Sequence, residues 1–139
     1  MDPIISTAAF IKRNWAGAAD WPREAVVPWL AWHAGNGYAA VTRDGRGRIN
    51  GVGLARPAAS AEAGRDDQYH HAAQGPVIFM DLLIARTPPA MLSLWRLLKR
   101  RFGMRERVAM QRWKYNGKLI VHSMKRYDQK LEALNHGRI

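Results

Sequence analysis

The run VIFMDLLIA, Val77–Ala85, constrains the fold more than any other part of this sequence, because only Asp81 interrupts its apolar residues. A strand with one face in water alternates apolar and polar residues, whereas a strand that is covered on both faces is apolar almost throughout. The run therefore predicts a central strand in a sheet that is covered on both faces.

A helix is predicted directly after this strand. Thr87 is a residue type that caps helix starts, Pro88 suits the first helical position, and Gly103 would stand just past the end. Apolar residues at helical spacing predict the stripe that this helix buries, which consists of Met91, Leu94, Trp95, Leu98 and Phe102.

A hairpin is predicted before the central strand, with strands at 38–43 and 48–56 and a turn at Asp44-Gly45-Arg46-Gly47. Gly51 and Gly53 weaken its return strand, and they predict a bulge or a close approach by another backbone.

A second hairpin is predicted after the helix, with strands at 107–115 and 118–126. The dipeptide Asn116-Gly117 between them favours a two-residue turn. Such a turn would place Gln111 opposite His122, with an apolar and aromatic face on one side of the hairpin and a partly basic face on the other.

Two helices are predicted before the first hairpin. Ser6 or Thr7 would cap the first helix, which would run to Trp15. The second would span about 20–33, with a kink or a break at Pro28. Four tryptophans in this part are expected to pack under the sheet: Trp15, Trp21, Trp29 and Trp32.

The order of these elements indicates one α/β (α+β) domain over residues 1–139, with a mostly antiparallel central sheet flanked by helices. Residues 57–76 are expected to form a mobile loop, and residues 128–139 a polar helix or a frayed tail. The absence of cysteine excludes disulfides, thiolate zinc sites and cysteine nucleophiles. We expect a soluble cytoplasmic protein, because no secretory signal and no run of ~20 apolar residues is present.

The stretch YAAVTRDGRGRINGVGLARP resembles the second and third strands of the GNAT family of N-acetyltransferases around their tight turn. MDLLIA is similar to that family's fourth strand, and 87–102 to the helix that holds the pyrophosphate of acetyl-CoA. The resemblance covers about 20–127. It implies a GNAT-like fold, an acyl-CoA-dependent N-acyltransferase activity with acetyl-CoA or another acyl-CoA as cofactor, and cofactor binding by Arg86 and Thr87.

The sequence departs from the family where the chemistry would take place. Family members have a glycine-containing loop whose backbone N–H groups bind the pyrophosphate, whereas this chain has Pro88 and Pro89, which lack N–H groups. The helix that commonly supplies a tyrosine as general acid is replaced by Asn116-Gly117. We therefore expect a divergent, trimmed GNAT-like protein with lost or atypical acyltransferase activity.

Positive charge is concentrated in the last third of the chain. Residues 1–85 contain eight Lys/Arg and eight Asp/Glu, whereas residues 86–139 contain fourteen Lys/Arg and three Asp/Glu, which accounts for the whole net charge of +11. Such a block attracts anionic partners, here a CoA-type ligand or a macromolecule. The expected anionic-partner surface consists of Arg96, Lys99, Arg100, Arg112, Lys114 and Lys125.

Two alternatives follow from the same residues. One is a non-enzymatic, nucleic-acid-binding accessory protein in which Trp113 and Tyr115 stack on bases while the basic residues contact phosphates. The other is a protein–protein adaptor that forms a homodimer through its tryptophan-rich N-terminal half.

Asp81 is the most unusual single placement, because a carboxylate inside an apolar strand needs a partner. Arg86 or another arginine would form a structural pair with it. Alternatively, Asp81 would act as a general base, and it is the catalytic candidate of this sequence. His70-His71 lacks the spacing of a metal site, so none is expected there, and His33 and His122 are expected to be hydrogen-bonded packing residues.

Overall fold

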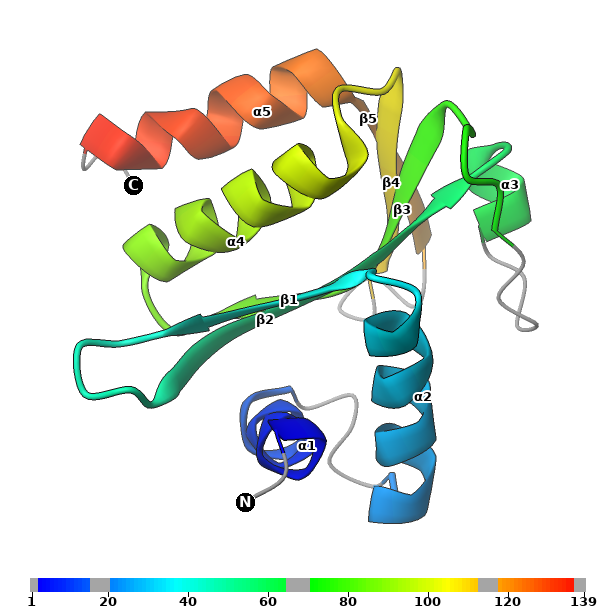
Figure 1. Cartoon of the computed structure of the whole chain (residues 1–139). Helices are drawn as coiled ribbons and strands as arrows, with labels where there is room; N and C mark the ends of the chain where they lie inside the picture. The colour runs from blue at the N-terminus through cyan, green and yellow to red at the C-terminus, as the bar shows by residue number, and fades with distance from the viewer. Residues whose placement is uncertain (1–2, 16–20, 65–70, 113–117, 137–139) are drawn as a thin grey trace.

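The computed structural model describes residues 3–15, 21–64, 71–112 and 118–136, in which helices lie on both faces of a five-stranded sheet (Figure 1). The strands lie across the sheet in chain order: β1 (Ala39–Arg43), β2 (Ile49–Ala58), β3 (Val77–Ala85), β4 (Arg107–Arg112) and β5 (Lys118–Ser123). Only β3 and β4 run parallel, and the other neighbours are antiparallel. The predicted α+β class, with a mostly antiparallel sheet flanked by helices, is confirmed.

The central strand β3 and the helix after it begin and end where the sequence predicts. Helix α4 (Pro88–Phe102) provides the crossover that the parallel pair requires. Thr87 caps it, because its Oγ1 accepts the N–H of Ala90 at 3.2 Å, and Gly103 follows its end with a φ of 75°. Side chains such as Leu94 and Leu98 are fully buried, which stabilises the fold by roughly 1.5–3 kcal/mol each.

The helices form a layer on each face of the sheet (Figure 1). Helix α4 and helix α5 (Met124–Glu132) cover one face, where Trp95 of α4 packs edge-on against Tyr127 of α5. Helices α1 (Pro3–Asn14) and α2 (Arg23–Gly35) cover the other face, above Val52 and Leu54 of β2. The short helix α3 (Ala61–Gly64) and the 3-10 helix η3 (Ala133–His136) complete the elements. None of the described helices is long and apolar enough to cross a membrane.

Of the two outcomes predicted for the glycines of β2, a bulge is present, and the close approach is made by side chains, not by another backbone. Gly51 pairs with Thr42 and Ile49 with Arg43, so Asn50 is the extra residue beside Gly51. A Cβ at Gly51 would lie 2.6 Å from Thr42 Oγ1 and 2.9 Å from Leu94 Cδ1, and one at Gly53 would lie 3.1 Å from Leu98 Cδ1. The missing Cβ atoms therefore let α4 pack closely onto the sheet.

The predicted pairing of the second hairpin is wrong. Gln111 pairs with Leu119, three residues before the expected His122. The connection comprises residues 113–117, which lie outside the described part of the chain, and β5 ends at Ser123. Helix α5 follows at once because Ser123 Oγ accepts the N–H of Arg126 and because helically spaced Met124, Tyr127 and Leu131 are buried.

The predicted start of the first helix is wrong, because helix α1 begins at Pro3 and Ser6 and Thr7 therefore lie inside it rather than capping it. Asp20, the predicted start of the second helix, lies outside the described residues, and α2 spans Arg23–Gly35. This helix is continuous through Pro28, so the predicted break does not occur. Pro28 and Glu24, the residue whose carbonyl loses its helical partner, are both exposed, so water can replace that hydrogen bond.

The segment 57–76 is more regular than predicted where it is described. Strand β2 continues through Ala58, which pairs with Val77, and α3 follows it. Residues 65–70 lie outside the described part.

Candidate functional site

The two parallel strands of the sheet separate and leave an opening between them. Strand β3 pairs with β4 only from Val77 to Met80, opposite Arg107 to Met110. Beyond Met80, β3 continues to Ala85 without a partner on this side within the described residues. A cavity of about 350 Å³ occupies the opening, a volume within the range of small-molecule sites.

This cavity crosses the sheet from one helical layer to the other. Trp15, just after α1, lines it on one side, while Met91 of α4 and Leu131 of α5 line it on the other. Most of the lining is apolar, and the polar side chains are Asp81, Gln111, Tyr127 and Lys130. The opening is therefore suited to an elongated apolar group with a polar end.

A β-bulge places Asp81 at the inner edge of this cavity. Leu54 of β2 pairs with Leu82 and the next residue, Ala55, pairs with Met80, so Asp81 is the extra residue on β3. Leu82 packs with Leu54 beneath α1 and α2, and Asp81 also contacts α2. Bulges commonly re-aim a side chain next to a functional site.

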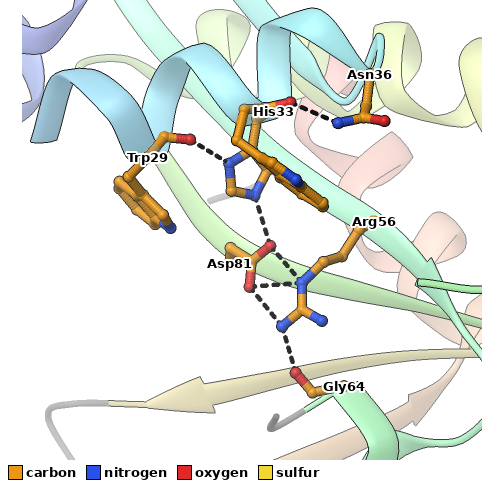
Figure 2. A network of polar contacts seen from close by, with 7 residues as sticks. Trp29, His33, Asn36, Arg56, Gly64 and Asp81 are labelled. Carbon is orange, nitrogen blue, oxygen red and sulfur yellow. Dashed lines mark hydrogen bonds and ion pairs between the residues drawn. The ribbon is translucent and has the colours of Figure 1, made fainter. Parts of the chain in front are cut away.

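Asp81 is bound by two buried residues from other elements (Figure 2). Arg56 of β2 donates from Nε to Oδ2 at 3.0 Å and from Nη2 to Oδ1 at 3.1 Å, and His33 Nε2 lies 2.8 Å from Oδ2. Only 2% of the Arg56 side chain and none of His33 is exposed. The predicted structural pair is thus confirmed with Arg56 as the arginine, whereas Arg86 is exposed and lies elsewhere.

Arg56 is itself held on its other sides. Its Nη2 also donates to the carbonyl oxygen of Gly64 in α3, and its guanidinium lies over the Phe79 ring at 5.0 Å. A Cβ at Gly64 would collide with that ring. A glycine at this position therefore allows α3 to approach Arg56 and complete its hydrogen bonds.

Both ring nitrogens of His33 face oxygen atoms. Nδ1 lies 2.9 Å from the carbonyl oxygen of Trp29, and Nε2 lies 2.8 Å from Asp81 Oδ2. These two contacts hold the ring in place between α2 and β3 and link His33 to Asp81.

Three tryptophans form an aromatic wall beside this pair. Trp15, Trp21 and Trp29 pack on one another with ring centroids 5.4–5.9 Å apart, and with Asp81 they line a smaller cavity of about 70 Å³. They are half-buried against the α1/α2 side of the sheet, as predicted, whereas Trp32 packs against Tyr38 and His71. The wall limits access of water to the carboxylate.

The start of α4 offers no amide groups to a phosphate. Pro88 and Pro89 lack N–H groups, the N–H of Ala90 bonds Thr87 Oγ1, and the N–H of Met91 bonds the Thr87 carbonyl. A pyrophosphate site of the GNAT kind therefore cannot form from the backbone of this helix.

Two of the cations expected to bind an anionic partner already have carboxylate partners. Arg96 donates from Nε and Nη2 to Glu132 at 3.0 and 2.6 Å, and Lys99 Nζ contacts Asp128 at 2.8 Å and Glu132 at 3.3 Å. These hydrogen bonds, that from Arg96 first, lower the pKa of Glu132 from 4.5 to about 2. The hydrogen bond to Asp128 is the main cause that raises the pKa of Lys99.

Of the other residues predicted for the anionic-partner surface, the structure describes the side chains of only two. Arg100 and Lys125 are exposed. The side chain of Arg112 and residues 113–117, which include Trp113, Lys114 and Tyr115, lie outside the described structure. An anionic-partner surface over α4 and the second hairpin, and base stacking on it, thus stay predictions.

The remaining histidines take packing positions where they are described. His71 Nδ1 lies 2.7 Å from the Tyr38 hydroxyl, and the ring of His122 packs against Tyr127 at 5.7 Å. His70 lies outside the described part of the chain. The prediction that His33 is a hydrogen-bonded packing residue is confirmed, but it missed the bond to Asp81.

Comparisons with protein-family models, with curated proteins and with solved structures find no match to this chain. Two features of the structure point to a function: the opening between β3 and β4, and the His33–Asp81–Arg56 network beside it.

Proposed function

We propose that the protein is a divergent, GNAT-like acyltransferase that binds an acyl thioester of the CoA type between β3 and β4. The observation that carries this proposal is the separation of two parallel strands next to the buried, hydrogen-bonded pair His33–Asp81 at a β-bulge. The segments that carry the resemblance to the GNAT family form β1 and β2, the second part of β3, and α4.

The opening offers an apolar lining for the acyl chain of a thioester and backbone N–H groups for its carbonyl oxygen. Its apolar lining accommodates the acyl chain. Successive N–H groups of a strand point to alternate edges, so some of those in the part of β3 beyond Met80 point away from β2 into the opening. Such groups are suited to stabilise the negative charge that develops on a thioester carbonyl during attack.

Acyl transfer to an amine requires proton movements that the His33–Asp81 pair can perform. The amine nitrogen attacks the thioester carbonyl, a C–N bond forms, and the C–S bond breaks with its electron pair leaving on sulfur. In the proposal, the proton that the pair shares passes to the thiolate, and the proton lost by the amine replaces it. Asp81, which lines the cavity, is the catalytic candidate, and the fully buried His33 is a positioning residue that acts through it.

Thermal unfolding in the presence of octanoyl-CoA tests this proposal. A ligand present at about one hundredfold above its Kd stabilises the folded state by about 2.7 kcal/mol, so the melting temperature should rise clearly. Met91→Trp should reduce the rise, because Met91 is half-buried and lines the cavity. The matched control is Ser93→Trp, an exposed position on the same helix that does not line it.

A melting temperature that millimolar acetyl-CoA and octanoyl-CoA both leave unchanged would refute the proposal. An equal ligand effect in Met91→Trp and in Ser93→Trp would show that the acyl group does not enter the opening.

A further inference from the structure

A second and larger cavity lies on the α1 side of the molecule, and arginines from four separate segments line it. Its volume is about 580 Å³. The arginines are Arg13 of α1, Arg43 at the end of β1, Arg48 just before β2 and Arg86 between β3 and α4. All four are exposed.

The charge of this arginine groove is largely uncompensated. Asp44 is the only carboxylate among the described lining residues, so the net charge of the lining is +3. Asp44 accepts the N–H groups of Arg46 and Arg48 at 2.8 and 3.0 Å and pairs with Arg48 Nε at 3.3 Å. The N–H of Arg48 is the main cause that lowers the pKa of Asp44, so its charge persists at neutral pH.

Two of the arginines have no partner of their own. Within the described part of the chain, the side chains of Arg13 and Arg86 form neither an ion pair nor a hydrogen bond. Like charges gathered around one cavity repel one another, and an anion bound among them would relieve that repulsion. The planar guanidinium fork of arginine matches the oxygen atoms of a phosphate group.

We propose that the arginine groove binds a diphosphate, namely that of the CoA-type thioester whose acyl group enters the opening between β3 and β4. This inference rests on the proposed function and adds the position of the anionic part of the donor. It assigns to side chains the role that the start of α4 cannot fulfil with backbone N–H groups. Thr87 and Asn50 add polar groups to the lining.

At two places the residues that line one cavity lie close in the chain to residues that line the other, as a single extended ligand requires. Ile84 lines the opening and Arg86, two residues further along, lines the groove. In the same way Trp15 lines the opening and Arg13, on the last turn of α1, lines the groove. Two residues of extended chain span only about 7 Å, so the pantetheine arm of a CoA-type ligand would connect the two sites past the end of β3.

Calorimetric titration with inorganic pyrophosphate tests the groove alone. The variant Arg13→Ala/Arg86→Ala should weaken pyrophosphate binding about tenfold or more, because it removes two charge-assisted contacts. Single replacements with Lys should weaken it less, because they keep the charge and lose the fork. The matched control is Arg100→Ala, an exposed arginine of α4 about 20 Å further along the helix, which should bind pyrophosphate like the unaltered protein.

Equal pyrophosphate affinities for the double variant and the unaltered protein would overturn the inference, and so would the absence of pyrophosphate binding at millimolar concentration. It would also be overturned if an oligonucleotide bound through Arg13 and Arg86 while pyrophosphate did not bind. Circular dichroism of the variants checks that the fold is retained.

A thioester without phosphates separates this inference from the proposed function. S-octanoyl-N-acetylcysteamine should stabilise the unaltered protein and the Arg13→Ala/Arg86→Ala variant equally, because it reaches only the opening. Stabilisation by this compound without pyrophosphate binding would refute the diphosphate site in the groove and leave the acyltransferase proposal in place. Pyrophosphate binding without any effect of acyl thioesters would refute the acyltransferase proposal and leave an anion site in place.

Discussion

Asp81 is a buried carboxylate whose two oxygen atoms both bind side chains of other elements. Arg56 donates hydrogen bonds to both oxygens, and the imidazole of His33 contacts Oδ2. Removing charged groups from water costs several kcal/mol per ion unless each hydrogen bond is made. The network therefore depends on all of its members, and the loss of one leaves an uncompensated charge.

Replacement of Arg56 by Leu should lower the free energy of unfolding by about 3–5 kcal/mol, because it leaves Asp81 without its main ionic partner. Denaturant-induced unfolding measures the change. Arg46→Leu, at an exposed turn position, is the control and should change stability by no more than about 0.5 kcal/mol. The double variant Arg56→Leu/Asp81→Leu should be more stable than Arg56→Leu, since both charges are gone, and a further loss in the double variant would contradict this account.

At the scale of elements, α4 and α5 are held together by a buried aromatic contact and a group of ion pairs. Trp95 packs against Tyr127 and donates from Nε1 to Asp128 at 2.7 Å. Glu132 on the next turn of α5 takes two hydrogen bonds from Arg96. Arg96 and Lys99 of α4 thus help to hold the last helix onto the sheet.

The ion pairs between α4 and α5 predict an acid-sensitive contribution to stability. The pKa of Glu132 is lowered from 4.5 to about 2 in the folded state by Arg96 and Lys99. Its contribution is therefore present above pH 4.5 and is lost as the pH falls toward 2. Compared with Glu132→Gln, the unaltered protein should be more stable at neutral pH, and the difference should shrink over this range.

Urea unfolding measured at a series of pH values tests this dependence. Glu106→Gln, which removes an exposed carboxylate, is the control. Its stability difference from the unaltered protein should not shrink as the pH falls. A stability difference for Glu132→Gln that stays constant from neutral pH to pH 2 would rule out the assigned role of Glu132.

At the scale of the whole molecule, the two cavities lie on either side of the end of β3, and one ligand is proposed to occupy both. Met91 belongs to the opening, and Arg13 and Arg86 belong to the groove. Changes at sites that share no partner usually add as free energies. The losses of octanoyl-CoA binding caused by Met91→Trp and by Arg13→Ala/Arg86→Ala should therefore add in the combined variant. A combined loss equal to the larger single loss would show that the ligand does not bridge the cavities.

Long-range pairing explains what the sequence did not predict about the site. Arg56 is an isolated charge in a strand of small and apolar residues, GVGLARPA, and this signal could have marked it as the counterpart of Asp81, but we named only Arg86 or another arginine. The bond from His33 depends on how α2 lies across the sheet, which no local pattern encodes. The arginine groove was missed because three of its arginines belong to residues 1–85, where charges cancel in number but not in position.

The sequence by itself determined the limits of β3 and of α4, because covered strands, helix caps and helical spacing are local patterns that residues within one or two turns decide. It also predicted that Asp81 needs a positively charged partner. Only the tertiary structure decided which residues are the partners, where β3 leaves β4, and that four arginines line one cavity. These features depend on strand register and helix packing, which bring together residues that are far apart in the chain.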